Sequence, residues 1–284
     1  MTLSLPPLCT VLVWALTVLA LPAMASSVAI VTDLSGKATA EGMNVAILFE
    51  IREDARVEVT DGTRMVAVYF SSGEEYTFTG PAQIHFRPGE PQVLSGPKAE
   101  KRSNPLARSG RNVAIKPIGV AQAGFVMRSW RNTARVKLLS PSGTLTLEHS
   151  PEFRWTEVES ALRYHFELTD DTGEPLYEAN VAASSLRLPA SLRLREGARY
   201  TWQVSTRLSN GRRYVGASDF SVASPELRSE AEALRPVATA PVSAQVTFAL
   251  WLEQMELKDE ARKYWKAVAS ERPRDERLKT LSVD

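Results

Sequence analysis

The sequence predicts a mainly β protein that ends in an α-helical hairpin. Residues 27–224 contain short apolar-rich runs with alternating side chains, separated by Gly, Pro, Asn and Asp turn signals. From residue 225 the apolar residues change to the three- and four-residue spacing of helices. Hydrophobic residues make up 44% of the 284 and charged residues 24%, a globular composition that argues against wholesale disorder.

Residues 1–25 have the pattern of a secretory signal peptide. The run PPLCTVLVWALTVLALPAMA carries no charge and ends in Ala23-Met24-Ala25, a small-x-small cleavage pattern. We expect cleavage after Ala25 and export to the periplasm, with no stable membrane insertion. An uncleaved membrane anchor stays open as the alternative, because no Lys or Arg precedes an apolar run that approaches spanning length. The single cysteine, Cys9, lies in this segment, so we expect a mature chain without disulfides or thiolate sites.

Residues 26–96 are expected to form an all-β domain. Asp61-Gly62 stands between two apolar-rich runs, which is the strongest short-range signal for a β-hairpin, and further turns are expected at Ser35-Gly36 and Ser72-Gly73. The run SGKATA followed by DGTRMVAVYFSSGEEYTFTGPA resembles the FecR-like periplasmic domain, a family named after a regulator of iron-citrate uptake. The resemblance implies an exported β domain. Only a few residues precede the apolar run, so we do not expect the namesake's sigma-factor-binding segment.

Residues 97–137 are interpreted as a basic linker, because they hold Pro and Gly together with many cations and one acid, Glu100. An anionic surface, such as phospholipid or a cell-envelope polymer, is one expected partner. The alternative is that the segment contacts the acidic residues of 26–96 in the same chain. Nucleic acid is not expected, because the chain is exported and Trp130 alone is no stacking platform. The candidate residues for the anionic surface are Lys98, Lys101, Arg102, Arg108 and Arg111.

Residues 138–224 are expected to form a β-sandwich, because several short strands alternate with turn signals such as Asn210-Gly211. Phe153 and Trp155 share one strand face, and Trp202 belongs to another alternating run, so these aromatic residues are predicted to be core rather than a sugar-binding surface. The pattern PEFRW, YHFEL, YTWQV and SDFSV resembles a fibronectin type III-like domain.

Residues 225–284 are expected to be a helical tail. PELRSEAEALRP predicts one short helix, and the runs over 241–257 and 258–273 predict a helical hairpin. The small, small, large and Pro positions of a tetratricopeptide unit match Ala249, Ala261, Trp265 and Pro273, so the hairpin resembles a single unit of that repeat.

One such unit is too few to form a core of its own, since repeats normally stack on neighbours. We therefore expect Trp251 or Trp265 to be buried within this chain, against 225–235 or the sandwich. If they are exposed instead, Trp251, Tyr264 and Trp265 are the candidate partner-binding residues.

No catalytic, metal-binding or cofactor-binding residue is predicted. His85, His149 and His165 lie in separate segments without a partner at metal-ligand spacing, and the sequence has no zinc-protease, Walker or nucleophile-elbow motif. The expected function is therefore a non-catalytic exported scaffold or binding module that recruits a protein or a cell-envelope polymer. Two alternatives stay open: an accessory of envelope signalling, with the FecR-like domain as sensor, and a cell-envelope hydrolase. The sequence does not set the oligomeric state.

Overall fold

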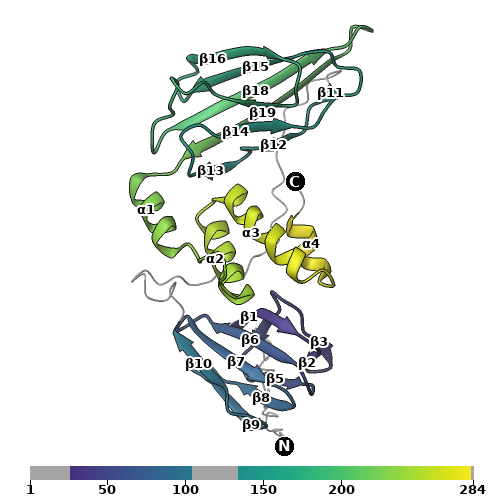
Figure 1. The fold of residues 1–284 in the computed structure, drawn as a ribbon, viewed down its shortest axis with the longest axis vertical. Coiled ribbons are helices and arrows are strands. Elements are labelled where there is room, and N and C mark those ends of the chain that lie inside the picture. Colours follow the sequence, from purple (N-terminus) through teal and green to yellow (C-terminus); the bar gives the residue numbers. More distant parts are fainter. Residues whose placement is uncertain (1–25, 104–133, 283–284) are drawn as a thin grey trace, which may run out of the picture.

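The computed structural model describes residues 26–103 and 134–282. It confirms a mainly β protein with a C-terminal helical region. Two β units lie at opposite ends of the molecule, and the helices lie between them (Figure 1). Within the described ranges, no helix is long and apolar enough to cross a membrane. The predicted signal peptide, 1–25, lies outside the described residues.

The first β unit, residues 26–103, consists of two antiparallel sheets that enclose one core. Its strands are β1 (Ser27–Ser35), β2 (Ala38–Ala40), β3 (Met43–Asn44), β4 (Glu50–Arg52), β5 (Arg56–Val59), β6 (Arg64–Tyr69), β7 (Glu74–Thr79), β8 (Ala82–Phe86), β9 (Pro91–Ser95) and β10 (Glu100–Ser103). One sheet has the order β10-β7-β6-β1-β4 and the other β3-β2-β5-β8-β9. Tyr69, Phe78 and Phe86 pack together between the sheets.

Strand β10 corrects the predicted boundary at residue 96. The segment expected to begin a linker pairs with β7 as an edge strand, with Lys101 opposite Tyr76 and Arg102 opposite Glu75. The linker prediction rests on composition. Composition gives no information on whether four residues pair with a neighbouring strand through backbone hydrogen bonds. The first unit therefore extends to Ser103.

The central strands β1 and β6 are buried on both faces. Ala29 and Val31 of β1 pack in the core between the sheets, whereas Ile30 and Val68 belong to a second apolar cluster that includes the helices. The runs VAIV and MVAVYF are continuous rather than alternating, as expected for strands that are covered on both sides.

The second β unit is a two-sheet sandwich, as the sequence predicts. Its strands are β11 (Ala134–Arg135), β12 (Leu138–Ser140), β13 (Thr144–Thr146), β14 (Glu152–Trp155), β15 (Tyr164–Asp170), β16 (Pro175–Val181), β17 (Ser185–Arg187), β18 (Arg199–Arg207) and β19 (Arg213–Val222). The larger sheet has the order β11-β19-β18-β15-β16, with β13 also on β19, and the smaller sheet is β12-β14-β17. Phe153, Trp155 and Trp202 are fully buried between the sheets, as predicted.

The tail forms the predicted short helix and hairpin, followed by a fourth helix that the sequence analysis did not predict. The helices are α1 (Pro225–Leu234), α2 (Val242–Gln254), α3 (Lys258–Glu271) and α4 (Glu276–Ser282). The Ser224 side chain caps α1 by accepting a hydrogen bond from the Leu227 amide. Helix α2 is buried on nearly every side, which requires packing partners all round it.

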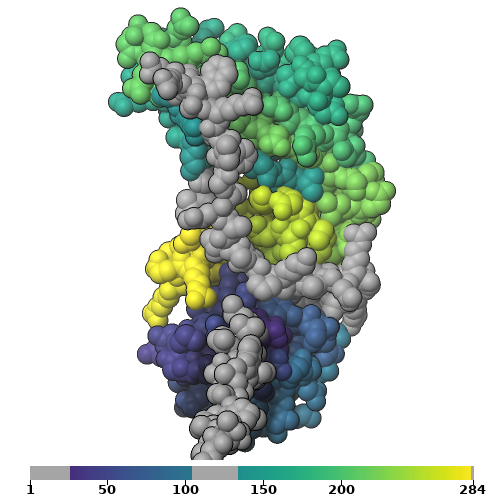
Figure 2. All heavy atoms as spheres, turned by 180° about the vertical axis from the view of Figure 1, so that it is seen from behind, coloured from purple at the N-terminus to yellow at the C-terminus, as the bar shows by residue number. Residues whose placement is uncertain are grey.

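The hairpin of α2 and α3 fills the space between the two β units. Helix α2 packs on β1 and α3 packs on β13. A single apolar cluster contains Ile30 from the first unit, Leu147 from the sandwich, and both hairpin tryptophans. Trp251 is 1% exposed and Trp265 is 0% exposed, which confirms that the hairpin buries its aromatic residues within this chain. Seen from behind, the yellow helices again lie between the blue and green units (Figure 2).

Polar contacts fix the hairpin to the sandwich. The Thr144 hydroxyl donates to the Glu256 carbonyl at 2.9 Å and accepts from the Lys258 amide at 3.0 Å, and the Leu145 amide donates to the same carbonyl at 2.8 Å. Ser140 donates to the Asp259 carboxylate at 2.6 Å. The turn between α2 and α3 is thereby held by the Thr144 hydroxyl and the Leu145 amide of β13, which sets its position along the strand.

An ion-pair cluster fixes the other side of the tail to the first unit. Asp33 is only 3% exposed, and its carboxylate accepts from Arg272 at 3.0 and 3.2 Å and from Arg64 at 3.3 Å. Asp275 accepts from the Ile47 amide at 3.2 Å. Because a buried carboxylate requires compensating donors, the Arg272 contacts stabilise one particular docking position.

We predict that Arg272→Ala destabilises the protein by about 1.5 to 3 kcal/mol, since it removes charged hydrogen bonds from a buried carboxylate. Urea unfolding measures the change. Arg274→Ala is the matched control, because Arg274 is exposed and two residues away, and its free energy of unfolding is expected to equal that of the wild type. Equal stability of both variants would show that the Asp33 contacts do not hold the tail.

Candidate functional site

An open hollow lies on the sandwich, where the segment from Arg135 to Lys137 passes the loop after β14. It has a volume of about 420 Å³. Hydrogen bonds fix its walls: the Val136 amide donates to Val215 at 3.1 Å, and the Thr156 amide donates to Lys137 at 2.8 Å. The lining residues are Arg135, Val136, Lys137, Thr156, Glu157, Val158, Glu159, Ser160, Leu208 and Tyr214.

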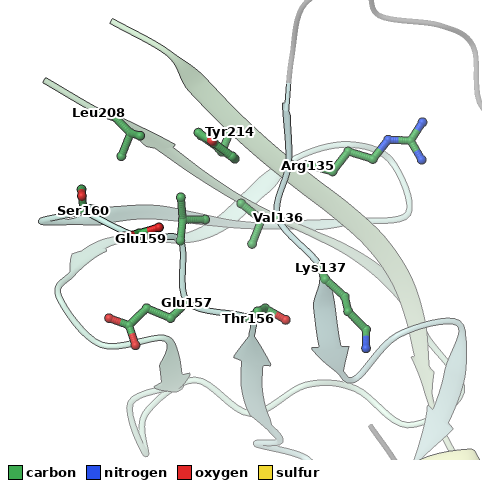
Figure 3. A pocket seen from close by; sticks show the side chains of 10 residues that line it. Arg135, Val136, Lys137, Thr156, Glu157, Glu159, Ser160, Leu208 and Tyr214 are labelled. Atoms are coloured by element: carbon green, nitrogen blue, oxygen red, sulfur yellow. The ribbon is translucent and has the colours of Figure 1, made fainter. Parts of the chain in front are cut away.

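The charges of this first hollow are divided between its two sides. Figure 3 shows Arg135 and Lys137 on one side and Glu157 and Glu159 on the other, with Val136 between them. Such a surface suits a polar partner of mixed charge. The buried end of Tyr164 holds the acidic loop in place, because its hydroxyl accepts from the Val158 amide at 2.7 Å.

A second hollow lies next to the first, on the outer face of the larger sheet. It has a volume of about 320 Å³ and is open to solvent. Its charged lining residues are Arg163, Arg207 and Arg213, with His165 beside them; the remaining lining residues are Tyr164, Asn180, Ser205 and Thr206. Strands β15, β16, β18 and β19 bring these residues together from positions up to 50 apart in the sequence.

The predicted basic residues are divided between the edge of the first unit and a segment outside the described residues. Lys101 forms an ion pair with Glu74, and its ammonium lies 5.7 Å from the centre of the Tyr76 ring. Arg102 stands opposite Glu75. These contacts match the alternative in which the basic segment contacts acidic residues of its own chain. Lys98 is exposed, and Arg108 and Arg111 lie outside the described residues.

The hairpin aromatics do not form an exposed partner-binding surface, which corrects their candidate role. Trp251 and Trp265 are buried, and the Trp265 indole donates to Glu253 at 3.3 Å. Tyr264 is half-buried and packs edge-to-face on Phe248, with ring centres 4.9 Å apart. The physical reason is that a single helical hairpin becomes stable only when its apolar face is covered, which is also why the sequence predicts burial of a hairpin tryptophan.

The three histidines lie in three different environments. His85 pairs with Asp54 at 3.3 Å, His149 contacts Glu196 at 3.4 Å, and His165 lies in the second hollow. In the part of the chain that the structure describes, no group of three or more His, Cys, Asp or Glu side chains is placed to hold a metal ion.

The residues of the second hollow were not among the predicted site residues. Arg163, Arg207 and Arg213 do not cluster in the sequence, and only strand pairing aligns them. A signal was present in the alternation, since RYHF and STRLSNGRRY place arginines on the side opposite the predicted core residues. The sequence does not give the cross-strand register of β15, β18 and β19, because a turn predicts a hairpin but not how three strands align across a sheet.

Comparison with known proteins gives structural likenesses at low similarity. No family model matches the chain, and no curated protein matches it. CopC from Methylosinus trichosporium OB3b is 17% identical, with 32% of this chain and 96% of that chain covered and a TM-score of 0.26. The fn3 domain of the human collagen alpha-1(XX) chain is 22% identical, with 35% of this chain and 93% of that domain's chain covered and a TM-score of 0.23.

A bacterial ice-binding adhesin of 1.5 MDa is similar over a longer stretch. It is 14% identical, with 70% of this chain and 54% of that chain covered and a TM-score of 0.25. The chain therefore spans about half of that structure. TM-scores this low assign neither a family nor a function to the chain.

Burial of Glu75 gives a prediction for pH dependence. Burial, the largest cause, raises the pKa of Glu75 above its ordinary value of 4.5, and the charges of Arg102 and Arg64 oppose the rise. The folded state then favours the protonated form. The stabilisation that comes from the protonated Glu75 carboxyl is complete below pH 4.5 and is lost as the pH rises through the folded pKa. Glu75→Gln is therefore expected to raise the free energy of unfolding at neutral pH and to have no such effect below pH 4.5.

Urea unfolding at the two pH values measures this difference. Glu58→Gln on β5 is the control, because Glu58 is exposed. Its free energy of unfolding is expected to equal that of the wild type at both pH values. Glu75→Gln could instead lower the free energy of unfolding at neutral pH. That result would mean that the attraction of Arg102 and Arg64 for the charged carboxylate stabilises the fold more than burial of that charge destabilises it.

Proposed function

We propose that this protein is a non-catalytic exported scaffold or binding module that recruits another component of the cell envelope. In this proposal residues 1–25 are a cleaved signal peptide and residues 26–103 are a FecR-like domain. The observation that supports the proposal is the common apolar cluster, through which the helices join two β units. A scaffold needs surfaces at a fixed separation, and this packing provides it.

The arrangement of surfaces also supports a binding role. The open hollows lie around the starts of β15 and β19, whereas the chain leaves β19 for the helices after Val222. Across a ten-residue strand these ends are separated by roughly 30 Å. Among the described residues, the helices therefore occupy one end of the sandwich and do not cover its other end, where a partner could bind.

The proposal predicts that the mature chain begins at Ser26 and is recovered with soluble periplasmic contents. Cell fractionation followed by mass spectrometry of the N-terminal peptide measures both. A chain that keeps residues 1–25 and sediments with membranes would contradict this form of the proposal. That result would favour the accessory of envelope signalling.

Affinity purification tests recruitment itself. The tagged mature chain, incubated with an envelope fraction of its own cells, is expected to retain a defined component that excess untagged chain displaces. The reason is that untagged chain competes for a component bound by the tagged chain, whereas it does not compete for a component adsorbed to the resin. The Arg272→Ala variant is the internal comparison, because loosening the tail is expected to reduce retention if the fixed spacing matters. Failure to enrich any component over bare resin would contradict a recruiting role.

A further inference from the structure

Three arginines form a row across the outer face of the larger sandwich sheet. Arg207 at the end of β18 is directly opposite Arg213 at the start of β19. His165 of β15 is opposite Ser205, so Arg163, two residues before His165, falls beside Arg207 on the same face. The Thr206 hydroxyl donates to the Arg163 carbonyl at 2.7 Å and fixes this register.

The row points away from the sandwich core. Tyr164 and Phe166 are buried between the sheets, so their neighbours Arg163 and His165 lie on the solvent side. All three arginines are exposed, and all three line the second hollow, whose lining contains no carboxylate. The hollow is therefore lined by arginines that three adjacent strands place side by side.

Some other arginines in the described ranges are neutralised by carboxylates of the same chain. Arg64, Arg262 and Arg272 each form an ion pair with a carboxylate. No ion pair within 26–103 or 134–282 engages the guanidinium groups of the row. Like charges opposite one another on a sheet are destabilising. A ligand that neutralises them offsets this repulsion.

The chemistry of the row favours a phosphate group. Guanidinium groups are planar and donate paired hydrogen bonds that match phosphate and carboxylate oxygens. Strand spacing places the three side chains over about 10 Å. A phosphate monoester presents three oxygens and nearly two charges, so it can engage several guanidiniums at once, whereas a carboxylate has two oxygens and one charge.

The acidic residues farther along the same face limit the size of the ligand. Glu167 follows His165 at the next outward position of β15, and it stands opposite Glu178 on β16. A long polyanion that followed the strands toward the helices would meet both carboxylates. The favourable region is therefore confined to the end of the sheet, which suits a single phosphate group better than a nucleic acid.

The geometry points to Arg163, Arg207 and Arg213 as a binding site for a phosphate group, with His165 and Ser205 at its inner edge. This assignment gives the proposed binding module a ligand class and so rests on the proposed function. The site differs from the first hollow, where Glu157 and Glu159 oppose the cations. It also differs from the basic segment 97–137, whose described basic residues lie either in the first β unit or, as Arg135 and Lys137, along the first hollow.

Titration calorimetry with inorganic phosphate tests the site. We expect saturable binding to the mature wild-type chain and at least about tenfold weaker binding to Arg207→Gln, because the central arginine loses its charged hydrogen bonds. The matched control is Arg199→Gln, since Arg199 is exposed on the same face at the other end of β18, and its affinity is expected to be unchanged. Arg213→Gln provides a second, independent variant of the row.

The results that would overturn the site are no saturable phosphate binding by the wild type, or equal affinity for wild type, Arg207→Gln and Arg213→Gln. Far-ultraviolet circular dichroism confirms that each variant is folded. Failure of the affinity purification would reject the recruiting role and leave the phosphate titration as it stands. Failure of the titration would reject the site and leave recruitment through another surface.

A second arm identifies the source of the phosphate group. Phosphatidylcholine vesicles with and without phosphatidic acid are sedimented with the mature chain. Retention only on vesicles that contain phosphatidic acid, reversed by inorganic phosphate and lost in Arg207→Gln, assigns the site to a lipid head group. Binding of free phosphate without vesicle retention assigns it to a soluble phosphate ester.

Discussion

Insertion of the α2–α3 hairpin between two β units is the interaction on which the rest of the structure depends. Strand β1 presents Ile30 outward, β6 presents Val68, and α2 is apolar on nearly every side. None of these surfaces is stable in water, so each requires the others. At about 25 cal/mol per Å² of buried apolar area, the cluster outweighs any single polar contact in the molecule.

The polar contacts around this cluster determine where the hairpin docks. Apolar packing is not directional, and helices could slide along β1 or β13 with little change in buried area. Thr144 fixes the turn of the hairpin on one side, and Asp33 fixes Arg272 on the other. Because the chain passes from the end of β19 into α1, the row of Arg163, Arg207 and Arg213 lies at the end of the sandwich remote from the helices.

The sequence predicts those parts of the fold that depend on local pattern. The turn at Asn210-Gly211, the aromatic core around Trp202, and the burial of Trp265 follow from alternation, turn chemistry and helical spacing. The partner of the hairpin could not be derived in the same way, although the unbroken apolar run of β6 indicated a covered face. The arginine row depends on cross-strand register, which is set by packing over the whole sheet.

Native-state hydrogen exchange tests directly whether the hairpin holds the two β units together. If it does, the slowest-exchanging amides of α2 and α3 open with the same free energy as those of β1 and β19, because separating the helices removes a shared core. Mass spectrometry of peptides from the purified chain gives these values. Helix amides that open at much lower free energy than both β units would show that the hairpin undocks while the units remain folded, and would contradict the account.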